Sequence, residues 1–409
     1  MNYKFANRLS FLQPNPLREN ARKNMMHPEV ISFAFGFPPE EAFPIEKMAK
    51  ISKALYELPD HEVFLQYGDT KGHPMLLEPL AKRLETVYDV YDEQSDDLMI
   101  VSGSTQGMDL TVKAFCNEGD IVLMEAQTFS GAVNAVLSYG AIAKPIEMKG
   151  ETIDVEQVES ALANDTEGKI KLIYLIPTFQ NPLGTSMPLE DRHAIYEIAK
   201  KYGVVIYEDD PYGDLLYEGE PIPRIKSFDT EGLVIYSGSF SKILAPSTRL
   251  GFIAASKPII EKLILGKQSV DSHTNQYWQL IAAKLMTDYD FEAHIDSLRA
   301  LYREKFEAMI EGLEKINPEL LTYIRPTGGY FLCAKLADDV CSVKFNDYLI
   351  DHHVAIIPGN VMSVEKKGFE KYFRLNFTKP SIEEIETGMA IINDALKFAV
   401  KSSNKTIAS

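Results

Sequence analysis

The sequence has few residues of the kinds that mark disulfide-rich or membrane proteins. It contains three cysteines, Cys116, Cys333 and Cys341, which are too few and too irregularly spaced for a disulfide framework or a zinc site. We therefore expect a reducing, cytoplasmic location and no bound metal. The N-terminal residues lack the apolar core of a signal peptide, and no apolar run approaches the length of a membrane span.

The chain also lacks a surplus of basic residues. Its 42 lysines and arginines face 59 acidic residues, which gives a formal charge of −17, and no basic stripe or block of like charge stands out. This balance argues against nucleic acid and anionic membrane as partners. An anionic ligand would have to be held by local donors. The hydrophobic fraction of 45% is ordinary and predicts a sizeable globular core.

Apolar runs alternate with amphipathic segments through the middle of the chain. DLMIVSG (97–103), DIVLMEA (120–126) and KLIYLIP (171–177) each precede a helical pattern, and the runs VVIYEDD, LVIYSGS and LGFIAAS follow. Continuous apolar strands interleaved with helices are typical of a mostly parallel sheet that is covered on both faces. The sequence therefore predicts an α/β fold.

The pattern changes after about residue 290. A long polar helix leads to the short strand patterns GGYFLCAKL and KYFRLNFT and to two more helices, which is typical of a smaller α+β domain. Residues 1–45 are rich in turn formers and indicate an extended arm that packs on this domain. We expect a large domain over 46–292, the arm and the smaller domain over 1–45 and 293–409, and an active cleft between them.

The segment SGSFSKILAPSTRLG (237–251) follows an apolar run and carries one lysine, Lys242. The carboxyl edge of an open α/β sheet is where such folds hold ligands. Ser239, Ser241 and Arg249 suit a phosphate group, because a guanidinium fork matches a phosphate dianion better than an ammonium does. Lys242 is then free for chemistry, as an amine whose pKa is lowered by nearby cations and desolvation and which attacks an aldehyde.

Two other interpretations of this segment stay open. The first is a plain junction between strand and turn, with a solvated lysine and a surface arginine. The second is the S-x-x-K signature of serine acyl transfer, which Ser239 and Lys242 satisfy. That signature needs a downstream K-T-G, which the sequence does not contain.

Two more polar clusters follow predicted strands. Ser104 and Thr105, in SGSTQG (102–107), lie at a predicted helix N-terminus, where free N–H groups favour phosphate. Serine and threonine are also ordinary helix caps. Asn181, in FQNPLG (179–184), offers an amide to a phenolate oxygen, although Asn-Pro is equally a plain turn former.

Three residues with other chemistry accompany them. Asp209, in YEDDPYG (207–213), would be a desolvated carboxylate that needs a cation such as a protonated ring nitrogen, with Asp210 as a solvated cap. Two acids capping a turn are the alternative. Phe129 is placed to cover a heteroaromatic ring or to fill the core. Arg374, in an apolar strand, needs an anion, either a substrate carboxylate or a salt-bridge partner.

With these residues placed, the chain resembles the fold-type I pyridoxal-phosphate aminotransferases. Among them it is similar to the class I enzymes that act on 2-aminoadipate, kynurenine and aromatic amino acids. The resemblance extends from NPLRE (15–19) to KYFRLNFT (371–378) and includes SFSK-x3-P-x2-R-x-G, QNP-x-G and EDDPY in the family's form. It implies a large domain with a seven-stranded sheet and a ping-pong transfer of an amino group from an L-amino acid to a 2-oxo acid such as 2-oxoglutarate.

The resemblance implies a role for each site residue. Lys242 would form the Schiff base with pyridoxal 5′-phosphate and move the proton, and Asp209 would keep the pyridine nitrogen protonated. Asn181 and Tyr212 would bond the phenolate oxygen, and Arg374 would bind the α-carboxylate. Contacts to the ring face and the phosphate would come from Phe129, Ser104, Thr105, Ser239, Ser241, Arg249 and, across a homodimer interface, Tyr67 of the neighbouring subunit.

The sequence departs from the family's pattern at several positions. Phe35 and Gly36 stand where relatives commonly have two glycines, so the ring of Phe35 would narrow or gate the substrate pocket. Thr105 replaces a frequent glutamine and Phe129 a common tyrosine, which leaves the chemistry intact. Two other functions share these motifs: a lyase or decarboxylase on the same scaffold, and the effector-binding module of a transcription regulator. The regulator is disfavoured because it would add a basic DNA-binding domain.

Overall fold

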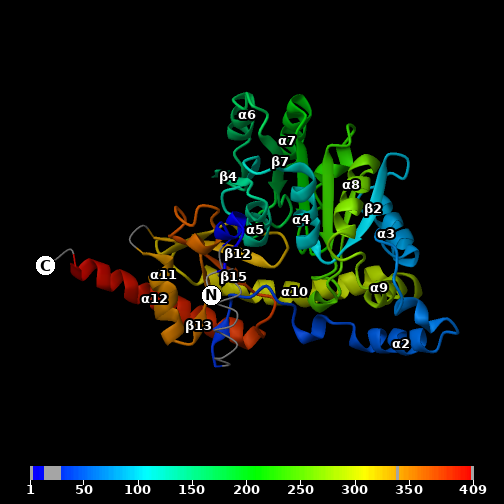
Figure 1. Cartoon of the computed structure of the whole chain (residues 1–409). Coiled ribbons are helices and arrows are strands. Elements are labelled where there is room, and N and C mark those ends of the chain that lie inside the picture. Colours follow the sequence, from blue (N-terminus) through cyan, green and yellow to red (C-terminus); the bar gives the residue numbers. More distant parts are fainter. Residues whose placement is uncertain (1–2, 13–28, 338–339, 407–409) are drawn as a thin grey trace.

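The computed structural model describes residues 3–12, 29–337 and 340–406, so the NPLRE motif (15–19) lies outside the described residues. Its main element is a seven-stranded sheet (Figure 1). All neighbouring strands in it are parallel except for the two pairs that β10 forms, which confirms the predicted α/β fold with a mostly parallel sheet. In spatial order the strands are β2 (Asp96–Val101), β10 (Gly251–Ser256), β9 (Val234–Ser239), β8 (Val205–Asp210), β7 (Ile170–Leu175), β3 (Ile121–Glu125) and β4 (Ile142–Ile146).

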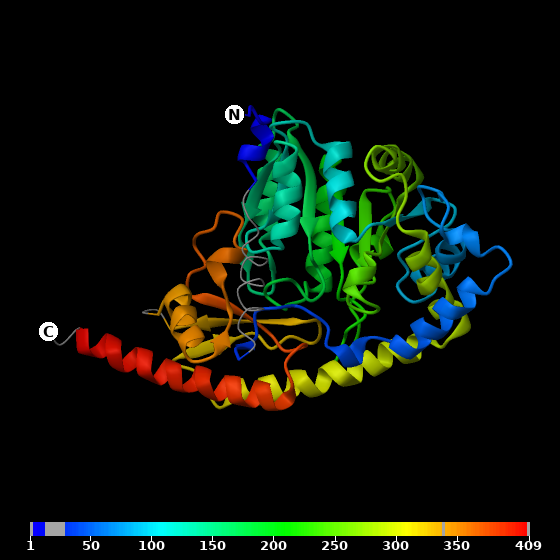
Figure 2. The same ribbon diagram turned by 60° about the horizontal axis from the view of Figure 1, so that its bottom comes forward.

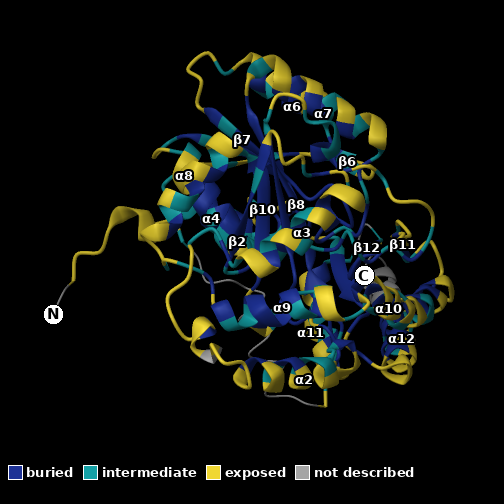
Figure 3. Ribbon diagram, turned by 90° about the vertical axis from the view of Figure 1, so that its right-hand side faces the viewer, coloured by how far each residue is buried: buried dark blue, intermediate teal, exposed yellow. Residues whose placement is uncertain are grey.

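Helices cover both faces of this sheet because its strands present apolar side chains to both sides. Met99 and Val101 of β2 pack with α4, α5 and α8, whereas Leu98 and Ile100 pack with α3 and α9. Helices α6 and α7 cover the remaining part, next to β7 and β8. The result is a buried centre surrounded by more exposed outer surfaces of the helices (Figure 3). The helices are α3 (Pro74–Thr86), α4 (Ser104–Phe115), α5 (Ser130–Ser138), α6 (Val155–Ala163), α7 (Leu189–Tyr202), α8 (Lys257–Gln268) and α9 (Gln276–Asp288).

The C-terminal part forms a second sheet of four antiparallel strands. Helix α10 (Phe291–Glu314) runs beside α12 (Ile382–Thr406) beneath both sheets, yellow and red in Figure 2. Gly312 allows this close approach, because a Cβ there would lie 2.7 Å from Cβ of Met389. The domain boundary near residue 292 stays a prediction. The strands are, in order, β11 (Leu321–Tyr323), β12 (Phe331–Leu336), β15 (Tyr372–Asn376) and β14 (Ile357–Pro358), with α11 (Ser342–Asp351) alongside.

Residues 31–37, which we call the crossing segment, connect the two sheets. Its first strand, β1 (Ile31–Ser32), pairs in parallel with β13 (Val354–Ala355), and its later residues reach the edge of the large sheet. The chain then enters α2 (Ile45–Tyr56), and a small hairpin of β5 (Met148–Lys149) and β6 (Thr152–Ile153) lies apart. None of the helices in the described ranges combines the length and apolar composition needed to cross a bilayer.

Candidate active site

A cavity of ≈ 200 Å³ lies at the carboxyl edge of the large sheet, below the crossing segment. Parallel strands end at the same edge, so their terminal residues meet there although they are far apart in sequence. Most of the predicted site residues line this cavity, and Tyr67, Phe35 and Arg374 are the exceptions. The predicted residues in the wall are Gly36, Ser104, Thr105, Phe129, Asn181, Asp209, Tyr212, Ser239, Ser241, Lys242 and Arg249.

Lys242 follows the end of β9 and turns its amine toward the crossing segment. Its Nζ donates a hydrogen bond to the carbonyl oxygen of Gly36 at 2.8 Å and lies 5.0 Å from the ring centre of Tyr330. Desolvation lowers the pKa of Lys242 to about 8, and the positive charges of Arg374 and Arg249 add to this effect. A sizeable fraction of the amine is therefore neutral near physiological pH and can act as a nucleophile.

Asp209 is the penultimate residue of β8 and is only 6% exposed. Its Oδ2 accepts a hydrogen bond from the Tyr174 hydroxyl at 2.7 Å, while its Oδ1 has no hydrogen-bond partner among the described residues. Burial raises the pKa of Asp209 to about 7 against the opposing hydrogen bond from Tyr174. An unpartnered buried carboxylate oxygen in a cavity wall fits a cationic N–H donor, such as a protonated ring nitrogen.

The opposite end of the cavity has the features of a phosphate site. Ser104 and Thr105 are the first residues of α4, where free N–H groups and the helix dipole favour an anion. Gly103 precedes them with φ +84°, and a side chain there would collide with the guanidinium of Arg249. Arg249 itself adopts a left-handed conformation with φ 51°. The backbone is therefore shaped to bring the helix N-terminus and this guanidinium together.

Arg374 lies behind the cavity wall rather than in it. Its Nη1 donates to Asn181 Oδ1 at 2.7 Å, its Nη2 donates to the carbonyl oxygen of Ala34 at 2.9 Å, and it stacks on the ring of Phe331 at 4.0 Å. Both of these oxygen partners are neutral. Burial lowers the pKa of Arg374 to about 10. A desolvated guanidinium next to neutral acceptors retains the capacity to bind a carboxylate.

Two residues lie elsewhere than the sequence indicated. Asp210 is not a solvated cap: it is buried, and its Oδ2 accepts hydrogen bonds from Arg224 Nε at 3.0 Å and from the Tyr236 hydroxyl at 2.9 Å. Phe35 packs with Cys333 in a small core next to the cavity instead of lining it. Tyr67, expected to act across a dimer interface, is 84% exposed on the surface, and its role stays a prediction.

Sequence reasoning predicted Phe129 but missed the other apolar residues of the wall. Phe37 stacks on Phe35 with ring centres 5.2 Å apart and lines the cavity in its place. Their spacing was the available signal, because side chains two residues apart on an extended segment lie on the same face. The other apolar residues of the wall are Ile176, Pro211 and Pro246.

Known proteins resemble this chain over nearly its whole length. The family described as aminotransferase class I and II matches residues 28–392. Aromatic-amino-acid aminotransferase 1 of Thermococcus litoralis is 38% identical, over 91% of this chain and 89% of its own. The multiple substrate aminotransferase of Thermococcus profundus has a TM-score of 0.91 at 35% identity, covering 97% of this chain and 98% of that one. LysN, the alpha-aminoadipate aminotransferase of Thermus thermophilus, solved with N-(5′-phosphopyridoxyl)-L-leucine, has a TM-score of 0.87 at 30% identity and covers 97% and 98%.

Proposed function

We propose that this chain, which belongs to the class I and II aminotransferases and is a pyridoxal-phosphate-dependent enzyme, acts on aromatic or 2-aminoadipate-like L-amino acids or on a broad range that includes them. The acceptor would be a 2-oxo acid such as 2-oxoglutarate, in a ping-pong reaction. The names of three relatives support this range, since they act on aromatic amino acids, on multiple substrates and on alpha-aminoadipate.

The observation that carries the proposal is the meeting of three groups in one cavity. They are the amine of Lys242, the unpartnered carboxylate oxygen of Asp209, and the α4 N-terminus beside Arg249. These groups match, respectively, the aldehyde, the ring nitrogen and the phosphate of pyridoxal phosphate. When bound, this cofactor supplies an aldehyde that reacts with amines and a ring that withdraws electrons from the bonds at the substrate Cα.

The residues around the cavity would divide the remaining work. Lys242 Nζ would be the attachment point of the cofactor and would then take the proton from the substrate Cα, which its pKa of about 8 allows. Asp209 would hold a proton on the ring nitrogen. Asn181 and Tyr212 would bond the phenolate oxygen, and Arg374 the substrate α-carboxylate. The cofactor's ring and phosphate would be held by Phe129, Ser104, Thr105, Ser239, Ser241 and Arg249.

The proposal includes a cytoplasmic homodimer in which Tyr67 completes the partner's cofactor site. Tyr67 is 84% exposed, and Leu65 and Tyr56 nearby in the sequence are 69% and 55% exposed. Exposed large apolar side chains such as these are common at protein interfaces. The three cysteines are unpaired, which fits a reducing compartment.

Chemical trapping tests the proposal directly. Borohydride should reduce the bond between lysine and cofactor, and the cofactor should then be found by mass spectrometry on the peptide that contains Lys242. A screen of aromatic, acidic and branched donors with 2-oxoglutarate should form glutamate with a donor from the proposed range. Ammonia and an oxo acid formed without an acceptor would indicate a lyase, and cofactor binding without any turnover would indicate a regulatory module.

A further inference from the structure

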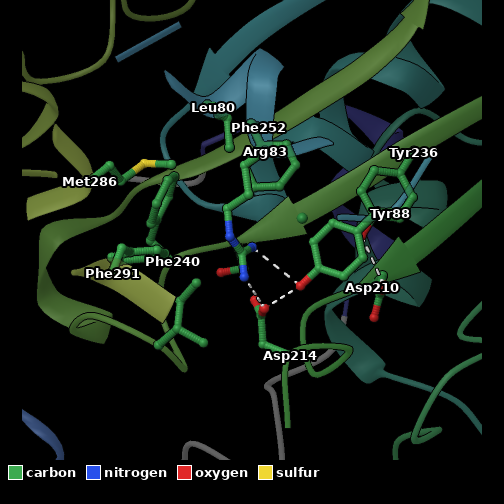
Figure 4. Close-up of a pocket in the computed structure, with 13 residues that line it drawn as sticks. Leu80, Arg83, Tyr88, Asp210, Asp214, Tyr236, Phe240, Phe252, Met286 and Phe291 are labelled. Atoms are coloured by element: carbon green, nitrogen blue, oxygen red, sulfur yellow. Dashed lines mark hydrogen bonds and ion pairs between the residues drawn. The ribbon is translucent and has the colours of Figure 1, made fainter. Parts of the chain in front are cut away.

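The segment 209–214, which begins with the last two residues of β8, carries polar side chains on both of its sides. Asp209 and Tyr212 line the cofactor cavity, whereas Asp210 and Asp214 line a second, separate cavity (Figure 4). That second cavity measures ≈ 20 Å³, room for a water molecule and not for an organic ligand. The charged residues of this cavity therefore bind other residues of the protein and not a ligand.

Asp214 is held by a buried cluster that joins three separate parts of the chain. Arg83 Nη2, from α3, donates to Asp214 Oδ1 at 2.6 Å, and the Tyr88 hydroxyl donates to the same oxygen. Arg83 Nε donates to Glu292 Oε1, at the start of α10, at 2.6 Å. Burial alone would raise the pKa of Asp214, but the charge and hydrogen bonds of Arg83 and the Tyr88 hydroxyl outweigh it and hold the pKa below its usual value.

Asp210 has an ion pair of its own on the same side of the segment. Its partner is Arg224. The side chain of Arg224 is 6% exposed, and that of Asp210 is 1% exposed. Arg224 also lies 4.3 Å from the ring centre of Tyr88, so one aromatic ring joins both ion pairs. Between them, Gly213 passes so close to the Asp210 carboxylate that a side chain there would collide with it. The two ion pairs therefore hold the segment from Asp210 to Asp214 on the side that faces away from the cofactor cavity.

Buried ion pairs contribute little net stability, because desolvation offsets most of their attraction. What such pairs supply is geometry, since each charge tolerates one placement of its partner. We propose that Arg83 and Arg224 are positioning residues of the cofactor site, which hold Asp214 and Asp210 and thereby, together with the pairing of β8 and β9, set where Asp209 and Tyr212 stand. This inference rests on the proposed roles of Asp209 and Tyr212 toward the cofactor.

The chain contains a matched control for this network. Lys226 Nζ is also a buried cation between two carboxylates, 2.8 Å from Asp96 and 3.0 Å from Asp229, and its side chain is 3% exposed. Neither carboxylate belongs to the segment 209–214. An ion-pair replacement at Lys226 and Asp96 therefore changes a buried cluster without altering the segment 209–214. It also leaves the buried Asp229 without its cation, so it is at least as severe for the fold as the change at Arg83 and Asp214.

The test replaces one ion pair of the network, and one of the control cluster, by apolar residues. Replacing a buried ion pair in this way is often neutral for stability. The apoprotein of the double variant Arg83→Met with Asp214→Leu should bind pyridoxal phosphate with a Kd at least tenfold higher than that of the unaltered apoprotein. Absorbance titration measures this Kd. The kcat of this variant should fall while KM for the amino donor stays within twofold, because Arg374 is untouched. In Lys226→Met with Asp96→Leu, the Kd should stay within twofold. Circular dichroism and thermal unfolding of each apoprotein check the fold.

An unchanged Kd in folded Arg83→Met with Asp214→Leu would overturn the inference, and so would an equal loss in the control variant. If the double variant does not fold, Tyr88→Phe takes its place, since it removes one hydroxyl and keeps the stacked ring. That variant should raise the Kd about threefold, and an unaltered value would be the contrary result. Failure of the proposed function is a different outcome, in which the unaltered apoprotein itself does not bind pyridoxal phosphate.

Discussion

The two walls of the active cavity are built in different ways. The floor carries Asp209 and Lys242. Asp209 lies opposite Ser237 in the ladder of β8 and β9, and Lys242 lies in the turn that follows β9, so strand pairing positions this wall. The crossing segment above it has no place in the large sheet. Backbone pairing with β13 holds its start, and side chains from elsewhere hold its end. Lys242 Nζ donates to the carbonyl oxygen of Gly36, and Thr378 Oγ1 donates to that of Phe37 at 3.1 Å. We therefore expect the floor to determine cofactor binding and kcat, and the crossing segment to determine KM and specificity.

The largest effect should come from the floor, in Lys242→Ala. Loss of the amine removes both the attachment point and the proton acceptor, so kcat should fall at least about 10³-fold. The cofactor should still bind, because the α4 N-terminus and Arg249 are unchanged, and its absorbance should shift to that of the free aldehyde. Steady-state rates and spectra of the purified variant check this. Turnover within tenfold of the unaltered enzyme would refute the assignment of Lys242.

Arg374→Lys should have a smaller effect, which is confined to substrate binding. Arg374 holds the crossing segment through the carbonyl oxygen of Ala34. An ammonium keeps the charge but loses the fork that reaches both Asn181 and Ala34. KM for the amino donor should rise about 30-fold, with kcat reduced less than threefold. Kinetics at saturating cofactor measure this split. A large loss of cofactor affinity with an unchanged KM would mean that Arg374 belongs functionally to the floor.

The two walls also differ in how far the sequence predicts them. Asp209, Asn181 and Lys242 end apolar runs, and parallel strands bring such ends together, so their meeting in one cavity follows from pattern alone. The pattern does not predict that Phe37 lines the cavity in place of Phe35. That position depends on how β1 pairs with β13, which is more than 300 residues away. The burial of Asp210 was missed for the same reason: its partner Arg224 lies outside any motif.

The pH dependence of cofactor attachment tests whether the crossing segment closes over the floor. Desolvation, together with nearby cations, lowers the pKa of Lys242 to about 8, and only the neutral amine attacks an aldehyde. The rate at which apoprotein binds pyridoxal phosphate covalently should thus rise about tenfold from pH 7 to pH 9 and level off above that. Stopped-flow absorbance measures this rate. A rate that still rises about sevenfold between pH 9 and pH 10 would mean that the amine has the ordinary pKa of a solvated lysine.

The smallest effects should come from the crossing segment itself, where two phenylalanines two residues apart have opposite surroundings. Phe37 is 38% exposed and lines the cavity, so Phe37→Ala should raise KM for aromatic donors about fivefold, with little change in the free energy of unfolding. Phe35 is 7% exposed in its small core. Phe35→Ala should lower the free energy of unfolding by about 3 kcal/mol and leave the ratio of KM values for aromatic and acidic donors unchanged.

The pair is informative because each variant is the control for the other. Each variant removes one phenylalanine ring from the same stack, in which the rings lie 5.2 Å apart and 11° from parallel. Loss of the stack is therefore common to both variants. Any difference between them in donor preference must then come from which ring faces the cavity. Denaturant unfolding and a two-donor KM comparison are sufficient. If Phe35→Ala changes donor preference more than Phe37→Ala does, the Phe35 ring gates the substrate, and the crossing segment takes up a different arrangement when substrate is bound.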